Sequence, residues 1–451
     1  MAIKSLLEPI LEDGIKNTYY FEGRLLSAKD LREQQEANRR HHRQLGSLAG
    51  YGIVDGLDVS IENKGGSGAN PVVRIAGGKA VNLLGEVVEL PLDYIDVELS
   101  RILEPVDPAA TIFRDCDVEI SESLAPSGAG LYVLVISPTS QYEGYALKSG
   151  LQNRGVAYQC GRAYVVEGVQ LRLVRFDPLA MPDISYPTRD LLQNQVLNTG
   201  SPVLSDDYQN LSKLQNVVAH VCFGTETSKL SQTDLTRTVS NPVAGFDALL
   251  GESIGLEKCD VPIAMIYWTL DGIGFVDNWA VKRRAYPHVG VNASLPLSQD
   301  RSIAMFEAML YQFQEQIGNL LLDNLTVTEL ISLSAFDYFQ YLPPAGVIPQ
   351  HRGSYSGFAV DAFFSRQPHR SPEYVSQSQA REILFQSANF APIPIAQKQL
   401  VWLYKTWERD FEEVQGNTSA PHVIFTCGYA PYQAQAKFDL ARWDYSHYTR
   451  I

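Results

Sequence analysis

The residues best placed for metal chemistry are two adjacent histidines, His41 and His42, within a run that also holds three arginines. On a helix their side chains would point about 100° apart, which opposes joint coordination of one ion. The positive charge of the arginines also opposes binding of another cation. We therefore interpret the run as a solvated or interface face, and we predict no metal site.

A group of carboxylates is the second candidate for chemistry. Asp115, Asp117 and Glu119 would lie on one face of a strand, because side chains two residues apart share a face. The group lacks the glycine and the distant glutamate of a calcium-binding loop, which favours a solvated face or a turn. His220 lies in an apolar run read as a strand, and we predict a core histidine there.

The sequence contains none of the motifs that mark common catalytic centres. The nucleophile elbow GxSxG, the phosphate loop GxxxxGK(S/T) and the zinc motif HExxH are absent, and no GxGxxG follows a predicted strand. We therefore predict no catalytic residue, no cofactor and no enzymatic activity. A carboxylate pair that meets only in space leaves no such motif. A β-sandwich hydrolase acting on carbohydrate thus remains an alternative.

Composition and charge narrow the class of protein. The chain has 451 residues, 45% hydrophobic and 20% charged, which is typical of a folded protein with more than one domain. Its 37 basic and 51 acidic residues give a net charge of −14, which argues against a nucleic-acid partner. The five cysteines are widely spaced, so we expect reduced thiols. No apolar run approaches the ~20 residues that cross a bilayer, so we expect a cytoplasmic protein.

The N-terminal segment, residues 1–60, contains a polar helix that needs a surface to pack against. Ser27, with Asp30 three residues later, is a capping-box pattern that predicts a helix from about Ala28 to Leu45. Few of its residues are apolar, so it cannot be a conventional core helix. We predict that it contacts a partner. The residues expected to bind the partner in this segment are Phe21, Arg24, Gln34, Gln35, Arg39, Arg40 and Arg43.

A β-rich body is predicted over residues 61–295. Short apolar or alternating runs are bounded there by glycine and proline, and the clearest buried strands are 131–137 and 217–223. Asp271-Gly272 separates two further runs and predicts a β-hairpin. Regular short strands over this length indicate sandwich-like or barrel-like packing.

The apolar spacing becomes helical after residue 295. Apolar residues at i, i+3, i+4 and i+7 predict an amphipathic helix over residues 302–324. Thr326 with Glu329 predicts a second, capped helix that continues to Tyr341. The two would form a helical hairpin over residues 296–344.

The last segment, residues 345–451, is predicted to be a small α+β recognition domain. Its aromatic residues are dense, and most would fill a small core. A subset near the end is interleaved with basic residues, and we expect Trp443, Tyr445 and Tyr448 to form a contact surface. The predicted fold class of the whole chain is α+β, with a β-rich, sandwich-like body.

The order of motifs over residues 19–91 resembles a known family. It begins with Phe21-Glu22-Gly23-Arg24-Leu25-Leu26 and continues through a helix containing Gln34-Gln35. Tyr51-Gly52-Ile53-Val54-Asp55-Gly56-Leu57 follows, and then Gly85-Glu86-Val87-Val88-Glu89-Leu90-Pro91. This order is similar to the start of the TssK baseplate subunits of type VI secretion systems and of related proteins in phage-tail-like injection clusters.

The resemblance implies a structural baseplate adaptor of a contractile injection system. Such an adaptor would be a homotrimer whose N-terminal part binds baseplate wedge proteins. Its C-terminal domain would reach a membrane, a membrane protein or another distal partner. Two alternatives remain, the β-sandwich hydrolase and a receptor-binding, fibre-like module. A trimeric native mass would favour the adaptor, whereas a monomer with a deep acidic cleft would favour the enzyme.

Overall fold

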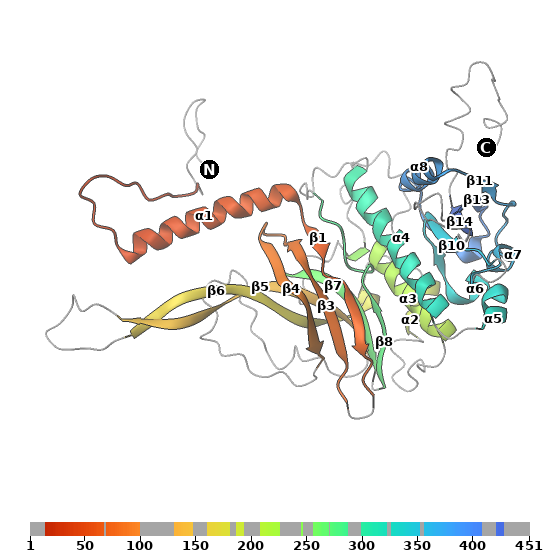
Figure 1. Ribbon diagram of the computed structural model, residues 1–451, viewed down its shortest axis with the longest axis horizontal. Helices are drawn as coiled ribbons and strands as arrows, with labels where there is room; N and C mark the ends of the chain where they lie inside the picture. The colour runs from red at the N-terminus through yellow and green to blue at the C-terminus, as the bar shows by residue number, and fades with distance from the viewer. Residues whose placement is uncertain are drawn as a thin grey trace, which may run out of the picture.

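The computed structural model describes residues 14–66, 69–99, 130–147, 160–180, 186–193, 208–225, 245–246, 256–269, 271–286, 299–322, 326–351, 356–407 and 421–427. Within them the protein has the predicted α+β class, with a β-rich body and a smaller helical part. Figure 1 shows the body at the centre and the C-terminal domain on one side. A helix and a long β-hairpin project from the other side.

The first sheet is built around its central strand, β3 (Val72–Val81). β4 (Val87–Glu98) pairs with β3 in antiparallel register along its whole length. β2 (Val59–Asn63) and β1 (Gly52–Gly56) share the opposite side of β3. Among the described strands, β4 therefore lies at an edge of this sheet.

The second sheet has the strand order β6-β5-β7-β8 and is antiparallel throughout. β5 (Gly130–Leu147) and β6 (Cys160–Phe176) form a long hairpin. β7 (Val261–Thr269) pairs with the first part of β5, and β8 (Gly272–Asp277) returns beside β7. This return confirms the hairpin predicted at Asp271-Gly272.

The two sheets pack face to face around one hydrophobic core. Val73 and Ile75 of β3 lie in the same buried cluster as Leu134 and Ile136 of β5 and Trp268 of β7. In each strand, alternate residues point into this core, as expected where two sheets face each other. The body is therefore a β-sandwich, as predicted.

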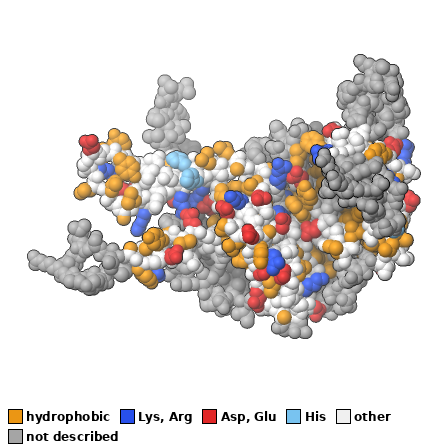
Figure 2. All heavy atoms as spheres, in the orientation of Figure 1, with side chains coloured by type: hydrophobic (Ala, Val, Ile, Leu, Met, Phe, Trp, Pro, Cys, Tyr) orange, Lys and Arg blue, Asp and Glu red, His pale blue; other side chains and the backbone are white. Residues whose placement is uncertain are grey.

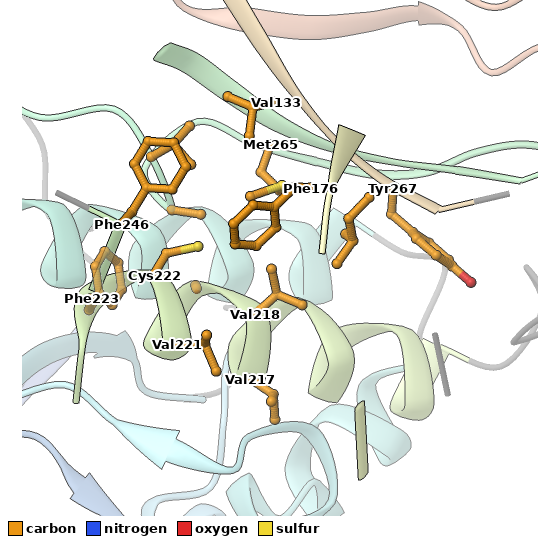
Figure 3. Packing of buried hydrophobic residues seen from close by; sticks show 14 of the residues in the cluster. Val133, Phe176, Val217, Val218, Val221, Cys222, Phe223, Phe246, Met265 and Tyr267 are labelled. Carbon is orange, nitrogen blue, oxygen red and sulfur yellow. The ribbon is translucent and has the colours of Figure 1, made fainter. Parts of the chain in front are cut away.

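Helices cover the other face of the second sheet, as Figure 3 shows. α3 (Tyr208–Phe223) packs Val217 and Val218 into the cluster that contains Val133 of β5 and Met265 of β7. α2 (Tyr186–Leu192) and α4 (Gln299–Leu322) also contact α3. The described part of the body thus has three layers, two sheets and a helical layer.

The structure corrects the predicted strand over residues 217–223, which form the end of α3. A short apolar run fits a buried helix as well as a buried strand, so its periodicity cannot decide between them. Leu211 and Leu214 extend the apolar spacing upstream at helical intervals, and both join the same core. That longer spacing explains the helix.

His220 is a core histidine, as predicted, but it lies on α3. Its Nδ1 atom is 2.9 Å from Thr225 Oγ1, and its ring stacks on Tyr341 with centroids 5.0 Å apart. Burial lowers the pKa of His220 to about 3, so the imidazole is neutral at physiological pH. A neutral, buried ring packed on an aromatic side chain has a structural role.

The second helix of the predicted hairpin is also corrected. Thr326 and Glu329 form the predicted capping box at the start of α5 (Val327–Ser332). Instead of continuing to Tyr341, the helix ends because the backbone of Leu333 is extended and its side chain enters the core. α6 (Ala335–Tyr338) then forms a separate turn.

The C-terminal domain shares its core with α4. Its elements are β9 (Tyr341–Leu342), β10 (Ala345–Pro349), α7 (Val360–Phe363), β11 (Glu373–Tyr374), α8 (Gln377–Ser387), β12 (Ile393–Pro394), β13 (Trp402–Trp407) and β14 (Pro421–Thr426). The main sheet has the order β10-β14-β13-β11. The ring centroid of Phe313 on α4 lies 5.2 Å from that of Phe425 on β14. Described residues on both sides of the predicted boundary at residue 344 therefore pack as one unit.

One cysteine differs from the prediction. Cys259 is disulfide-bonded, so the expectation of reduced thiols is wrong for it. Wide spacing along the sequence does not prevent two cysteines from meeting in space. Cys222 and Cys427 are not disulfide-bonded, and Cys116 lies outside the described residues. Among the described helices, none is both long and apolar enough to cross a membrane.

We predict that Phe313→Ala lowers the free energy of unfolding by about 3–5 kcal/mol, because it empties a site between Phe339 and Phe425. Leu322→Ala on the same helix is the control, since Leu322 is exposed and its loss should cost less than about 0.5 kcal/mol. Denaturant unfolding followed by circular dichroism measures both. Equal losses would contradict a core position for Phe313.

Candidate partner-binding surface

α1 (Ala28–Ala49) is a projecting helix whose one buried residue is Ala37. Ser27 and Asp30 form the predicted capping box at its start. Leu31, Leu45 and Leu48 are exposed. Most helices in proteins are stabilised by packing of an apolar face against the rest of the protein. The leucine side chains of α1 are instead exposed, so a partner can cover them.

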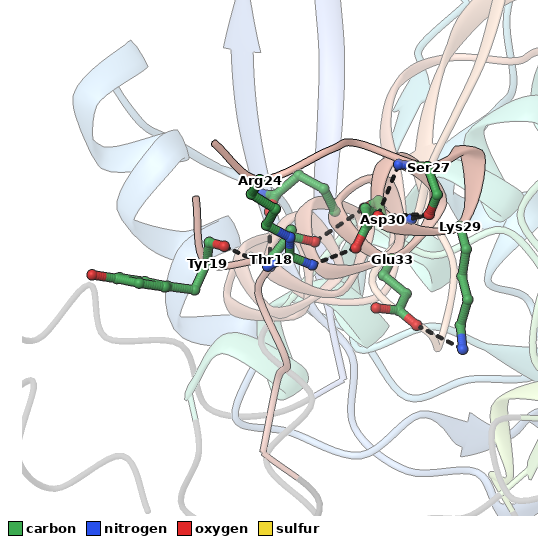
Figure 4. Close-up of polar contacts among 8 residues, drawn as sticks. Thr18, Tyr19, Arg24, Ser27, Lys29, Asp30 and Glu33 are labelled. Atoms are coloured by element: carbon green, nitrogen blue, oxygen red, sulfur yellow. Dashed lines mark hydrogen bonds and ion pairs between the residues drawn. The ribbon is translucent and has the colours of Figure 1, made fainter. Parts of the chain in front are cut away.

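The chain before α1 folds back onto the first turns of the helix, as Figure 4 shows. The Thr18 amide donates to Gln34 Oε1 at 3.2 Å, and the Thr18 hydroxyl donates to the Asp30 carbonyl oxygen at 3.0 Å. Arg24 forms an ion pair with the Asp30 carboxylate. Hydrogen bonds from Ser27, aided by Arg24, lower the pKa of Asp30 to about 2. We call this folded-back segment, residues 18–27, the N-terminal clip.

The residues predicted to bind a partner near the clip fall into two groups, those that make contacts within the chain and those that are exposed. Arg24 and Gln34 hold the clip together, so their role in this structure is intramolecular. Phe21 and Gln35 are exposed, as the prediction requires. The clip and helix start also expose apolar side chains that the prediction did not include, namely Tyr19, Tyr20, Leu25 and Leu26.

The C-terminal half of α1 is anchored to the turn between β3 and β4. A Cβ atom on Gly46 would lie 2.0 Å from the carbonyl oxygen of Gly85, so only glycine permits this approach. Gly85 has a φ of 79°, which also favours glycine. Arg43 donates to Glu86 Oε1 through Nε at 3.0 Å and Nη2 at 2.7 Å. This anchor fixes the direction in which the rest of α1 projects.

The outer part of the β5–β6 hairpin forms a second projection. β7 pairs with β5 from Gly130 to Ile136, whereas β6 pairs with it as far as Leu147. We call the two-stranded remainder, residues 138–147 and 160–169, the β arm. At about 3.3 Å per residue it extends roughly 30 Å. Its base is fixed by the Arg172–Asp260 ion pair between β6 and the start of β7.

The β arm exposes apolar side chains on both faces. Tyr142 and Val165 are directly opposite each other on one face. Tyr145, Tyr164 and Val166 lie on the other, and both tyrosines are 69% exposed. In the body, the same two faces of β5 are buried against the first sheet and the helices. Apolar side chains thus lie on both faces of the arm, where the described residues provide no cover. Figure 2 shows hydrophobic side chains on both projections.

A groove of about 670 Å³ lies where α1, β4 and the base of the β arm meet. Arg39 on α1 forms an ion pair with Glu167 on the arm at 3.3 Å, which joins the two projections. The groove walls include Val87 and Val88 of edge strand β4. The surface formed by the N-terminal clip, α1, this groove and the β arm is the candidate partner-binding surface.

The predicted basic residues lie on this surface but differ in their surroundings. Arg39 and Arg43 line the groove, and each is bound to an acidic residue of the chain. Arg40 is exposed on α1. Trp443, Tyr445 and Tyr448 lie outside the described residues. The β arm was not predicted from the sequence, although the tyrosine and valine residues that follow the buried strand 131–137 were a usable signal of strand structure.

A second cavity, of about 550 Å³, lies between the sandwich and the helical layer. Glu315 of α4 lines it, and Asp277 of β8 is buried close by. Burial, aided by the negative charge of Asp277, raises the pKa of Glu315 to about 8. Burial also raises the pKa of Asp277, although four hydrogen bonds from Gln312, Ala280, Gln215 and Trp279 oppose this shift. Glu315 therefore carries a proton at neutral pH.

This carboxyl pair is the feature closest to a glycosidase site, and its geometry is unfavourable for one. Both catalytic carboxyls of such an enzyme must reach the substrate. Asp277 is 1% exposed and does not line the cavity. Within the described residues, no group of three or more His, Cys, Asp or Glu side chains could hold a metal ion.

Comparison with known proteins found no match, either to a protein-family model or to a curated protein sequence.

We predict that Gly46→Ala loosens α1 from the body despite the better helix propensity of alanine. The new methyl group would clash with the backbone of Gly85, whereas Gly318→Ala on α4 meets no atom within 4 Å and should stabilise by up to about 1 kcal/mol. Hydrogen exchange should accelerate in α1 of the first variant alone. Unchanged exchange there would contradict the close approach.

We predict that Glu315 makes the protein less stable as the pH rises from about 5 to 8. The folded state keeps the Glu315 proton up to a pKa of about 8, whereas the ordinary value is 4.5, so the unfolded state loses it first. The free energy of unfolding can fall by up to about 1.4 kcal/mol per pH unit in this range. Glu315→Gln should remove this contribution in denaturant titrations. Identical pH profiles for both proteins would contradict it.

Proposed function

We propose that this chain is a structural assembly subunit that acts through its candidate partner-binding surface. The observation that carries the proposal is the β arm, a two-stranded ribbon with exposed tyrosine and valine on both faces. An isolated two-stranded ribbon is marginal in water, and exposed apolar patches of this kind mark interaction sites. A protein partner that covers both faces would remove this unfavourable exposure.

The particular assembly we propose is the baseplate of a phage-tail-like contractile injection system. Support comes from the resemblance of residues 19–91 to TssK-type adaptors, because the clip and α1 lie inside that region. The proposed partners are baseplate wedge proteins at this surface and two further copies of the chain in a homotrimer. The C-terminal domain would then contact a membrane or another distal partner.

The proposed location is the cytoplasm, and the Cys259 disulfide is the observation that opposes it, since disulfides persist mainly in oxidising compartments. Alkylation of thiols in intact cells before lysis distinguishes the cytoplasm from an oxidising compartment. A Cys259 thiol that is modified supports the cytoplasm, and a protected one contradicts it.

A test of the assembly role is deletion of the gene in cells that produce contractile particles. Loss of assembled particles in electron micrographs, restored by the wild-type gene, supports the baseplate role. Normal particles would contradict it. The fibre-like alternative predicts assembled particles that fail to attach to target cells, so an attachment assay separates the two.

We predict that Tyr145→Ser combined with Tyr164→Ser prevents assembly without unfolding the protein, because both side chains are mainly in solvent. The melting temperature should change by less than about 2 °C. Native mass spectrometry and co-sedimentation with baseplates then measure trimer formation and incorporation.

Tyr94→Ser is the matched control, since Tyr94 is similarly exposed but lies on β4 outside the β arm. Loss of the trimer places a second copy on the arm, whereas an intact trimer that fails to join the baseplate places a wedge protein there. Normal trimer formation and incorporation would contradict a binding role for the arm.

A further inference from the structure

The cavity beside Glu315, here called the carboxyl pocket, has walls suited to an aliphatic chain. It is bounded by β2, the β7–β8 turn, β8, α3 and α4. Its apolar lining comes from Val59, Ile61, Leu211, Ile273 and Leu320. Polar groups also line it, and their hydrogen bonds determine which atoms remain for a ligand.

Gln215 presents an acceptor to the pocket. Its Nε2 donates to Asp277 Oδ2 at 3.0 Å, which turns the amide nitrogen toward the buried carboxylate. Its Oε1 accepts none of the hydrogen bonds found among the described residues, although the side chain is only 5% exposed. Gln215 therefore offers its carbonyl oxygen to a molecule in the pocket.

Glu315 offers a second acceptor. Its Oε1 accepts from Asn278 Nδ2 at 3.1 Å, which leaves Oε2 without a hydrogen bond from any described residue. The charged groups that act on it are Asp277 on β8, Asp58 between β1 and β2, and Lys282 after β8. Lys282 Nζ donates to Asp58 Oδ1 at 2.7 Å and to the Gly56 carbonyl oxygen at 2.8 Å, and its positive charge opposes the rise in the pKa of Glu315.

The mouth of the pocket carries charges of both signs. Asp271 and Lys64 line it and are exposed. They are not joined by an ion pair within the part of the chain that the structure describes. Asp271 therefore provides a third acceptor near the entrance.

We propose that the carboxyl pocket binds a primary ammonium group on an aliphatic chain, with Gln215 Oε1 and Glu315 as its acceptors. The ammonium group donates three hydrogen bonds and has no acceptor, which matches a site rich in free acceptors. The methylene chain lies against the apolar walls. This inference does not depend on the proposed baseplate role.

Binding requires a proton to leave. Glu315 is protonated in the empty pocket at neutral pH, because burial raises its pKa to about 8. The ammonium group stabilises the carboxylate, so the Glu315 proton passes to solvent as the ion pair forms. The ligand keeps its own proton, since amines of this kind have a pKa near about 10.

Two sources supply this chemistry, a free aliphatic diamine and a lysine side chain of a partner protein. Isothermal titration calorimetry at pH 7 tests both sources. 1,4-Diaminobutane represents the free diamine, and Nα-acetyl-lysine amide, whose side-chain amine is free, represents the lysine of a partner protein. Repeating each titration in buffers of different ionisation enthalpy measures proton release, which should be about one per ligand bound. Affinity should rise with pH and level off above about pH 8.

Glu315→Gln tests the acceptor while preserving shape. It should weaken binding at least tenfold and abolish proton release, whereas Glu36→Gln, an exposed carboxyl on α1, should change neither. 1,4-Butanediol, which lacks the charge, should not bind. Stronger binding of the diamine assigns a free amine, and stronger binding of the lysine derivative assigns a protein side chain.

Three results would overturn the proposal. Neither amine binds, or the Glu315→Gln variant binds the amines as tightly as the wild type does, or 1,4-butanediol binds as tightly as 1,4-diaminobutane. Because particle assembly is measured separately, each of these outcomes leaves the test of the proposed function unaffected.

Discussion

The burial of both faces of β5 is the constraint on which the rest of the structure depends. Leu134 and Ile136 point into the sandwich core, whereas Val133 and Val135 point toward the helices. A strand covered on both sides must be apolar at almost every position, and residues 131–136 are. This strand joins the two sheets to the helical layer and also supports the β arm, which is its direct continuation.

Each of the two projections is anchored to the body at one end. The Arg172–Asp260 ion pair fixes the base of the β arm, and the approach of Gly46 to Gly85 fixes α1. Neither projection has a core of its own in the described residues. Apolar area held in solvent by an ordered scaffold has already lost much of its conformational entropy, so a partner that buries it pays less to bind. Such preorganisation favours the binding of a partner at these two projections.

The local signals in the sequence were sufficient where a few neighbouring residues determine the structure. The capping residues Ser27 and Thr326 marked helix starts correctly, and Asp271-Gly272 marked a hairpin. The apolar run at 217–223 failed because its own residues fit helix and strand equally. The second helix failed at Leu333, whose backbone is set by contacts with the C-terminal core.

The site was less predictable than the fold for a related reason. The polar helix α1 was identified because its lack of apolar residues is visible in one segment. The carboxyl pocket joins Gln215, Asp277 and Glu315, which are 62 and 38 positions apart along the chain. Only the packing of α3 and α4 against β8 brings them together. No spacing rule could have indicated that arrangement.

α4 connects the two halves of the molecule mechanically. Its first half places Ala308 and Met309 in the core beneath the sandwich, and its second half places Phe313 and Ile317 in the C-terminal core. A pull on the C-terminal domain is therefore carried by α4 into the sheets, since this one helix contributes to both cores. A displacement at one end of the molecule would in this way reach the other end.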